Sequence, residues 1–399
     1  MTVLQLTSHL DVGGITQYVL SLSRRLVERG HRVIVASDRG HREADVRDLG
    51  ATHWPVPLHT SAEFSLPVWR AWRHLAARLQ REPVDVIHAH TRVSQVIAQR
   101  LARRFRIPYV TTWHGAFRRR LGRQLWPCTG DVTITISRSV HQHLLQDFHV
   151  PAARARCISN GIDVAHYATA PDPAVIRAYR ELWRIPLGRP VIGGMGRMAS
   201  GRVKGFDLVL LAAQALETRV PDVEVLMVGD GPRRPFLEEI AKRLGLQERV
   251  HFVGASDDVR IPLAAMDVFV FSSRWPEGFG LSLVEAMAAG KPVVATRVGA
   301  TQDIVEHGQS GWLVDPEDPL ALAEGIARLL NDAAAASRLG SLAQMRVREL
   351  FSLDRMVDQI EAVYREVVES IPTPLARGSG LRAQGSCPQP PAPSPGQSR

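Results

Sequence analysis

The residues best suited to chemistry lie in one stretch, 274–296, with the sequence RWPEGFGLSLVEAMAAGKPVVAT. Glu277 falls in a glycine-bearing loop and Glu285 in the predicted helix 281–289. Glycines let a backbone approach a ligand, and a helix start offers free N–H groups to a phosphate. Since carboxylates repel phosphates, we expect the two glutamates to contact hydroxyl groups of the same ligand. The backbone expected near that ligand belongs to Gly278, Phe279, Gly280 and Leu281.

A second stretch, 193–207, reads GGMGRMASGRVKGFD and follows a predicted buried strand. It places Arg197, Arg202 and Lys204 among glycines, which suits a bound diphosphate. Lysine is scarce in this chain: of 49 basic residues only Lys204, Lys242 and Lys291 are lysines. Where arginine dominates so strongly, a retained lysine favours a need for its compact point charge.

The same stretch contains a look-alike of the dinucleotide-binding fingerprint, formed by Gly194, Gly196 and Ala199. In the true fingerprint the helix opens at once after the glycines. Here the composition predicts no helix before Phe206, so the pattern argues against a bound NAD.

Two features of the first half follow predicted strands. Gly13 and Gly14 come after the strand 3–6, and His114 comes directly after the strand 109–113. The carboxyl ends of parallel strands share one edge of a sheet, where ligands bind. His88 and His90 end another predicted strand and compete with His114 for a functional role. The tight turn at Asn160-Gly161 is either a hinge or cleft wall, or a plain turn.

A basic stretch, 116–127, repeats Phe117, Leu121 and Leu125 every four residues. Four arginines lie between these apolar residues: Arg118, Arg119, Arg120 and Arg123. One interpretation is an amphipathic surface for an anionic membrane or acceptor. The other is an ordinary packed helix with a charged face.

The charge of the chain is concentrated in its first half. Residues 1–165 hold 23 Lys and Arg against 12 Asp and Glu, a balance of +11, and the remainder holds 26 against 28, a balance of −2. This favours a solvated basic surface, an anionic acceptor or a membrane surface as partner, and we expect no nucleic acid. The three distant cysteines exclude a disulfide framework or a zinc site. With no apolar run of spanning length and no signal peptide, we expect a cytoplasmic protein, with peripheral contact at the inner membrane face as a further expectation.

Strands alternate with amphipathic helices throughout, which predicts an α/β fold with two doubly wound, Rossmann-like parallel-sheet domains facing a central cleft. We predict a first domain over 1–165, a linker over 166–190 around one short helix, and a second domain over 191–352. A C-terminal helix is predicted over 353–371, followed by a disordered tail over 372–399 that is rich in Pro, Gly and Ser.

Taken together, the Gly13-Gly14 turn, the NGID turn, the GR…KGFD run and EGFGLSLVEAMAAGKPVVAT resemble retaining glycosyltransferase family 4, of the GT-B fold. The resemblance runs to about residue 350. It implies a first domain that binds the acceptor, a second that binds a nucleotide-diphosphate-sugar donor, UDP- or GDP-linked, and an enzyme of the hexosyltransferase kind (EC 2.4). The basic first half favours a cell-envelope acceptor, such as lipopolysaccharide, a lipid-linked glycan or exopolysaccharide, and the alternatives are a plain polar glycan or a small-molecule acceptor.

The resemblance also implies roles for single residues. Arg197 and Lys204 would bind the diphosphate, Glu285 the ribose, and Glu277 the transferred sugar. His114 would bind the sugar and stabilise charge at its reacting carbon, while Gly13 and Gly14 would line the donor–acceptor junction. The loop before Lys204 is longer than in the usual family pattern. No DxD motif is present, so we expect no metal and no cofactor.

Three other functions compete with this interpretation. A nucleotide-sugar epimerase of the same fold would need no second substrate. An NAD-dependent oxidoreductase would use the glycines near Gly194. A non-catalytic sugar-nucleotide binder would have lost some of Arg197, Lys204, Glu277 and Glu285, all of which are present.

Overall fold

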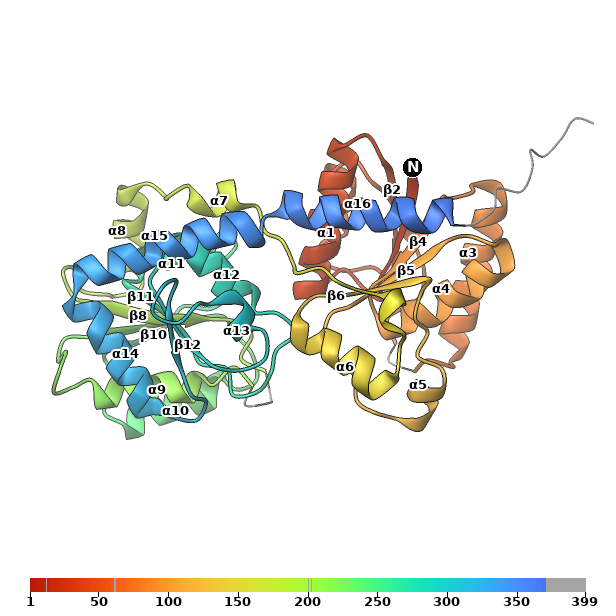
Figure 1. The fold of residues 1–399 in the computed structure, drawn as a ribbon. Coiled ribbons are helices and arrows are strands. Elements are labelled where there is room, and N and C mark those ends of the chain that lie inside the picture. Colours follow the sequence, from red (N-terminus) through yellow and green to blue (C-terminus); the bar gives the residue numbers. More distant parts are fainter. Residues whose placement is uncertain (12, 61, 200, 202, 371–399) are drawn as a thin grey trace, which may run out of the picture.

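The computed structural model describes residues 1–370 apart from 12, 61, 200 and 202. They form two α/β units side by side (Figure 1). The elements of the first unit are β1 (Thr2–Leu6), α1 (Gly14–Glu28), β2 (Arg32–Ser37), α2 (Glu43–Asp48), β3 (Thr52–Pro55), α3 (Leu66–Arg81), β4 (Val86–Ala89), α4 (Arg92–Phe105), β5 (Tyr109–Trp113), α5 (Leu121–Leu125), β6 (Val132–Thr135), α6 (Arg138–Phe148), η1 (Ala152–Arg154) and β7 (Ala155–Cys157).

Two short helices, α7 (Val164–Ala168) and α8 (Pro173–Leu182), connect the units. The elements that follow are β8 (Val191–Met195), α9 (Phe206–Ala215), β9 (Glu224–Val228), α10 (Arg234–Arg243), β10 (Val250–Phe252), α11 (Arg260–Ala265), β11 (Val268–Phe271), α12 (Leu281–Ala288), β12 (Val293–Thr296), α13 (Thr301–Ile304), β13 (Trp312–Val314), α14 (Pro319–Asn331), α15 (Ala333–Leu350) and α16 (Leu353–Glu369).

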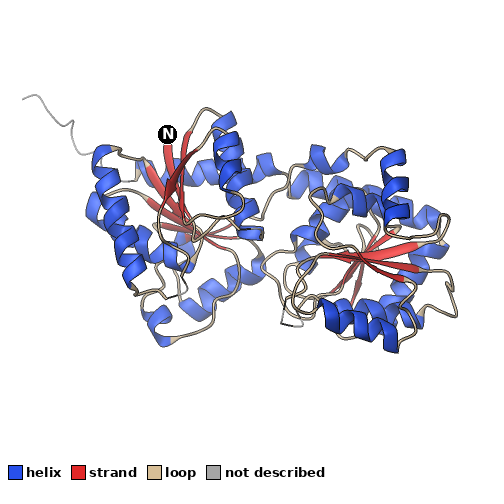
Figure 2. Cartoon of the chain, turned by 180° about the vertical axis from the view of Figure 1, so that it is seen from behind, coloured by secondary structure: helices blue, strands red, loops and turns tan. Residues whose placement is uncertain are grey.

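Both sheets are parallel and doubly wound. The first has the order β3-β2-β1-β4-β5-β6-β7, and the second has the order β10-β9-β8-β11-β12-β13. Helices cover both faces of each sheet (Figure 2), which explains why strands such as β4 and β11 are buried along their whole length. The strand order reverses beside β1 and beside β8, and ligands of open α/β sheets bind at the carboxyl edge of such a point. The predicted fold class is therefore confirmed.

The two units touch through apolar side chains. One buried cluster contains Trp113 and Ile136 of the first unit together with Phe279 and Leu283 of the second. Burial of such side chains is worth about 1.5–3 kcal/mol each. The carboxyl edges of the two sheets are thus held close together, with the candidate site between them.

The last helix crosses back from the second unit to the first. At the crossing, the Ile162 N–H donates to the Phe351 carbonyl (2.9 Å) and the Leu353 N–H donates to the Ile162 carbonyl (2.8 Å). From there α16 lies along α1, where Arg29 pairs with Asp358 at 2.7 Å. The sequence predicts this helix but not its return to the first unit.

Three expectations differ from the structure or lie beyond it. The linker region contains two short helices rather than one. The stretch 116–127 is not a packed amphipathic helix, because only Leu121–Leu125 is helical and both leucines are exposed, by 74% and 78%. The apolar residues that recur every four positions do not form a buried stripe, because Phe117 packs against the core beside Trp113 whereas Leu121 and Leu125 face solvent. The predicted disordered tail, 372–399, lies outside the described residues.

Candidate active site

The cationic loop after β8 brings Lys204 to Glu277. The Lys204 ammonium donates to Glu277 Oε2 at 2.5 Å, and Ser273 Oγ also donates to this carboxylate. The ion pair joins the end of the β8 loop to the loop after β11. Thus two residues that lie far apart in the sequence form one polar group at the carboxyl edge of the second sheet.

The loop conformation depends on Gly205, which has φ +58° and precedes α9. A Cβ there would lie 2.0 Å from the Ser272 carbonyl oxygen, so the close approach requires glycine. Helix α9 begins at Phe206, as predicted, and the glycine pattern around Gly194 therefore does not open a helix as the dinucleotide fingerprint does.

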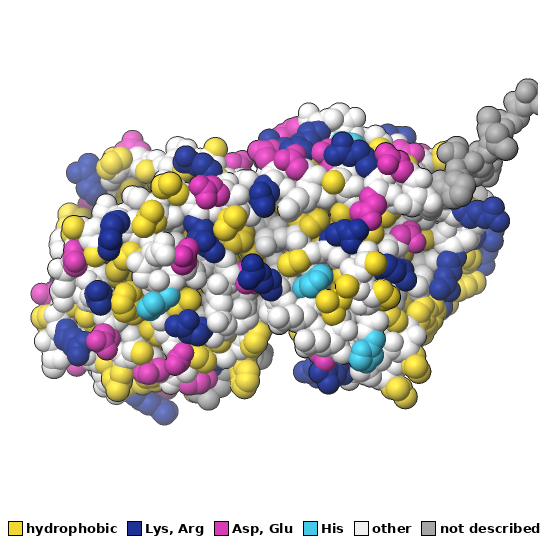
Figure 3. All heavy atoms as spheres, viewed as in Figure 1, with side chains coloured by type: hydrophobic (Ala, Val, Ile, Leu, Met, Phe, Trp, Pro, Cys, Tyr) yellow, Lys and Arg dark blue, Asp and Glu magenta, His cyan; other side chains and the backbone are white. Residues whose placement is uncertain are grey.

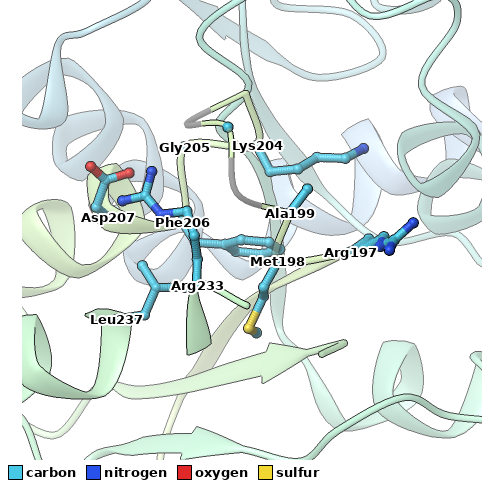
Figure 4. A pocket seen from close by; sticks show the side chains of 10 residues that line it. Arg197, Met198, Ala199, Lys204, Gly205, Phe206, Asp207, Arg233 and Leu237 are labelled. Carbon is cyan, nitrogen blue, oxygen red and sulfur yellow. The ribbon is translucent and has the colours of Figure 1, made fainter. Parts of the chain in front are cut away.

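Arg197 lies on the same side of the loop as Lys204. Figure 4 shows both side chains extending to one side, whereas Asp207 and Arg233 lie on the other side of the pocket. Arg197 is exposed and forms no ion pair with any residue that the structure describes. This side of the loop is therefore able to receive an anion. Arg202, also predicted in this cationic loop, lies outside the described residues.

Glu285 is held by a residue that the sequence did not single out. Tyr167, on α7 of the linker, donates its hydroxyl to Glu285 Oε1 at 3.1 Å. Burial raises the pKa of Glu285, while the Tyr167 hydrogen bond and the Lys204 charge lower it. Lys204 thus influences both glutamates, by its ion pair with Glu277 and by its charge at Glu285. An isolated tyrosine in a linker carries no pattern that would predict this contact.

Helix α12 begins directly beside these groups. Gly280 caps it with φ +109°, and Leu281 is its first residue, so the free N–H groups of its first turn lie at the cleft. Such a start attracts an anionic group. The second unit therefore supplies cations, carboxylates and a helix start at one sheet edge.

The first unit faces this edge with two of the predicted residues. A Cβ at Gly278 would lie 2.1 Å from the His114 carbonyl oxygen, so the backbones of the two units are in direct contact there. A Cβ at Gly14 would lie 3.6 Å from Leu281 Cδ1. Gly13 caps α1 beside Gly14. The structure therefore brings both Gly14 and His114 to the loop 278–281.

His114 ends a chain of hydrogen bonds that runs into the first unit. His114 Nε2 lies 3.3 Å from His90 Nδ1, and His90 Nε2 lies 2.5 Å from Gln5 Oε1. Because Gln5 Oε1 can only accept, His90 carries its proton on Nε2 and accepts from His114 through Nδ1. His114 is then the tautomer protonated on Nε2, which leaves its own Nδ1 as an acceptor. Burial lowers the pKa of His114 to about 3, so the ring is neutral.

The chain continues to the last helix. Gln5 Nε2 donates to the Tyr364 hydroxyl at 3.2 Å, and this hydroxyl lies 2.6 Å from His88 Nδ1. His88 Nε2 in turn lies 2.7 Å from Thr112 Oγ1. In the sequence, His88 and His90 were alternatives to His114 as the functional histidine. They are 0% and 1% exposed, so they lie in the interior behind His114 and do not face the cleft.

The four arginines of the stretch 116–127 divide into two kinds. Arg123 pairs with Glu63 at 2.7 Å, and Arg119 pairs with Asp147. Arg118 and Arg120 are exposed and form no ion pair within the described part of the chain. Half of the predicted cationic surface is thus neutralised by neighbouring carboxylates.

The NGID turn packs against the last two helices. Residues 161 and 162, in the NGID turn, lie against the crossing of α15 into α16, since a Cβ at Gly161 would lie 2.6 Å from the Ser352 carbonyl oxygen.

In the described ranges there is no group of three or more His, Cys, Asp or Glu residues that could hold a metal ion. No helix among the described residues is long and apolar enough to cross a membrane.

Comparison with known proteins agrees with this arrangement. Residues 12–166 match the model of "Glycosyltransferase Family 4", and residues 189–332 match that of "Glycosyl transferases group 1". A D-inositol 3-phosphate glycosyltransferase of Corynebacterium urealyticum is 31% identical over 75% of this chain and 74% of its own. An N-acetyl-alpha-D-glucosaminyl L-malate synthase of Bacillus anthracis is 28% identical over 91% of this chain and 96% of its own.

Solved structures show the same fold. A glycosyltransferase from Rickettsia africae superposes with a TM-score of 0.84 at 22% identity and covers 93% of this chain and 99% of its own. Anabaena HepE, solved in complex with UDP and glucose, superposes with a TM-score of 0.80 at 24% identity and covers 92% of this chain and 100% of its own. The two family models and the relative at 31% identity show the family, and the two facing parallel-sheet units agree with the solved structures. The chain therefore belongs to glycosyltransferase family 4 and is a glycosyltransferase of the GT-B fold.

Proposed function

We propose that this glycosyltransferase takes a sugar from a nucleotide-diphosphate-sugar, UDP- or GDP-linked, and transfers it with retention of configuration to a hydroxyl group of an envelope glycan or lipid-linked acceptor. The single observation that carries the donor assignment is the group formed by Arg197, Lys204 and Glu277 at the start of α12. It combines cations for a diphosphate with a carboxylate for sugar hydroxyls. The names of two relatives include the small hydroxyl-bearing molecules D-inositol 3-phosphate and L-malate rather than an envelope glycan, so the acceptor is less well supported than the donor.

Lys204 and Glu277 form an ion pair before a ligand arrives. In the proposed complex a diphosphate takes over the Lys204 ammonium, and the Glu277 carboxylate then accepts hydrogen bonds from the sugar. Glu285, already positioned by Tyr167, accepts hydrogen bonds from the ribose hydroxyls. Backbone N–H groups of 278–281 contribute at the sugar and phosphate.

The proposed reaction breaks the bond between the anomeric carbon and the diphosphate oxygen and forms a bond from that carbon to the acceptor oxygen on the same face. The acceptor proton passes to the departing diphosphate oxygen. Arg197 and Lys204 stabilise the charge that develops on the leaving group. His114 lies near the anomeric carbon on the opposite side and offers Nδ1 as a neutral acceptor.

A route through a covalent sugar–enzyme intermediate would require a carboxylate on the first unit. Asp11 is the acidic residue of the stretch 8–19, but it is engaged by His41 at 3.1 Å and by His9 at 3.3 Å. These contacts lower the pKa of Asp11 and direct it toward the loop after β2 rather than toward Glu277. This favours the same-face displacement.

The donor assignment is tested by thermal unfolding with UDP-, GDP- and ADP-sugars and with NAD. We expect one sugar nucleotide to raise Tm and to be slowly hydrolysed, and Arg197→Ala/Lys204→Ala to abolish both effects. Lys242→Ala is the control, because Lys242 is an exposed lysine near the end of α10 that does not line the pocket beside the loop. A Tm rise that the double variant retains would contradict the diphosphate assignment, and a rise with NAD alone would favour the oxidoreductase.

Turnover of the donor separates the remaining alternatives. An epimerase would convert the sugar nucleotide to a second sugar nucleotide with no acceptor present, whereas a transferase releases the nucleoside diphosphate. With an acceptor in hand, the anomeric coupling of the product in the NMR spectrum reports retention or inversion. An inverted product would refute the same-face step.

A further inference from the structure

An aromatic and basic surface of the first unit has no role in the site described above. It consists of exposed parts of α3, α4 and α5 and is called the α3–α5 face. Its exposed apolar side chains are Phe64 (67%), Leu66 (56%), Trp69 (45%), Leu121 (74%) and Leu125 (78%). Between α3 and α4 lies a shallow hollow lined by Trp69, Trp72, Arg100, Arg103 and Arg104.

The elements of this face are joined to one another. The Phe64 ring stacks on Trp126 with centroids 5.7 Å apart, and the Arg123–Glu63 pair lies beside this stack. The start of α3 and the end of α5 are thereby held together, so their exposed apolar residues belong to one continuous surface. A monomer rarely exposes apolar residues in such a group without a binding role.

The face carries a large excess of positive charge, with Glu63 beside it paired with Arg92 and Arg123. Residues 64–81 and 86–130 contain thirteen arginines and no Asp or Glu. Arg70, Arg73, Arg103 and Arg104 are exposed and form no ion pair with the described residues. Arg73 lies over the Trp69 ring at 4.8 Å, and Arg100 lies about equally far from Phe64 and Trp126. The contacts with aromatic rings thus position these arginines but leave their positive charges uncompensated.

On another face of the same unit, arginines form ion pairs with acidic residues. Along α1 and α16, Arg25 and Arg29 are paired with Asp354 and Asp358, and Figure 3 shows the two signs of charge interleaved there. The net positive charge of the first half is therefore concentrated on one face and absent from another. A partner for the α3–α5 face must be anionic and must also provide an apolar region in which aromatic and leucine side chains can be buried.

We propose that the α3–α5 face binds the surface of an anionic lipid bilayer. Tryptophan and phenylalanine are stable at the headgroup level, and arginines are attracted to anionic headgroups. The charged residues are spread over two helices rather than gathered in one deep groove, which fits a planar partner better than a single peptide. Two of the exposed leucines, Leu121 and Leu125, lie on α5, the helix that follows His114 in the chain.

This inference does not depend on the donor, but it does name the source of a lipid-linked acceptor. The test is co-sedimentation of the full chain with vesicles of phosphatidylcholine alone and with vesicles of phosphatidylcholine and phosphatidylglycerol in equal amounts, at low and high salt. We expect binding to the anionic vesicles, little to the neutral ones, and weakening by salt.

The informative variant is Arg73→Gln/Arg103→Gln/Arg104→Gln. Each arginine near an anionic surface contributes about fivefold to binding, so we expect roughly a hundredfold loss for the three. The matched control is Arg219→Gln/Arg338→Gln/Arg348→Gln, which removes three exposed arginines of the second unit that have no ion pair among the described residues. Trp69→Ser/Leu125→Ser tests the apolar contribution at high salt.

Wild-type protein that ignores anionic vesicles, or a triple variant that binds them as tightly as the control does, would overturn the proposal. Binding to single-stranded RNA in place of vesicles would also overturn it and assign the face to a polyanion. In every variant the Tm rise with the donor should be unchanged, so failure of the docking face is distinguishable from failure of the donor site.

Discussion

The contact between the two units at Gly278 allows a quantitative test of the site. Gly278→Ala places a Cβ 2.1 Å from the His114 carbonyl oxygen. A carbon and a carbonyl oxygen need a separation of about 3.3 Å. The two backbones must therefore move apart by about 1.2 Å, or the loop 278–281 must shift by that amount. The φ of Gly278 is not in the left-handed region, so the cost comes from this contact and from a tight approach to Ile136 Cδ1 at 3.2 Å.

A displacement of about 1 Å between reacting groups can cost on the order of 10²-fold in rate. We expect Gly278→Ala to lower kcat/KM by about that factor, which corresponds to about 2.7 kcal/mol of transition-state stabilisation. We expect a smaller effect on Tm than on activity, because the added methyl group meets the buried Ile136 only at the flexible end of its side chain. The parallel readouts are steady-state kinetics with the identified donor and the Tm of unfolding.

Gly122→Ala is the control, since a Cβ at Gly122 meets no atom within 4 Å. It should match the wild type in both readouts. If Gly278→Ala also keeps wild-type kinetics, the reasoning is refuted, because the working enzyme would then not bring His114 and Gly278 together as described. A large loss of Tm would instead mean that the contact stabilises the fold.

Two further predictions concern protonation. Tyr167→Phe removes a hydrogen bond that lowers the pKa of Glu285, so the acidic limb of donor binding, where the carboxylate becomes protonated, should move to higher pH. Tyr179→Phe, with no hydrogen bond from its hydroxyl in the described structure, is the control. An unmoved limb would count against a role for the Glu285 carboxylate. Burial lowers the pKa of His88 to about 3 in the folded protein, whereas an unfolded histidine titrates near 6.5. The unfolded state therefore binds more protons between these values, and the free energy of unfolding should fall by about 1.4 kcal/mol per pH unit from pH 6.5 down to about 3 from His88 alone, with a contribution in the same direction from His90. Chemical denaturation at several pH values measures this slope, and a slope that His88→Gln leaves unchanged would show that the buried network does not titrate as described.

The alternation of strands and helices was sufficient to predict two doubly wound sheets. Near-continuous apolar runs such as that of β11 are buried on both faces, and this burial is a property of the local pattern. The importance of the glycines at 205, 278 and 280 was also predictable, because a positive φ or a close approach of another backbone leaves few alternatives to glycine. Glu277, Glu285, Arg197 and Lys204 were found because they recur in a known order around such glycines.

Other parts of the site were not predictable because they depend on contacts between distant segments. Tyr167 reaches Glu285 only because the linker folds over α12, and Tyr364 reaches His88 only because α16 returns to the first unit. The exposure of Leu121 and Leu125 likewise contradicted a periodicity that predicts burial. The sequence alone determined the fold class and was sufficient to predict the donor-side residues, since both predictions rest on local patterns. The tertiary structure decided the tautomer of His114, the partner of Glu285 and the charge of the α3–α5 face, since hydrogen bonds and ion pairs depend on which side chains the fold brings within a few ångströms.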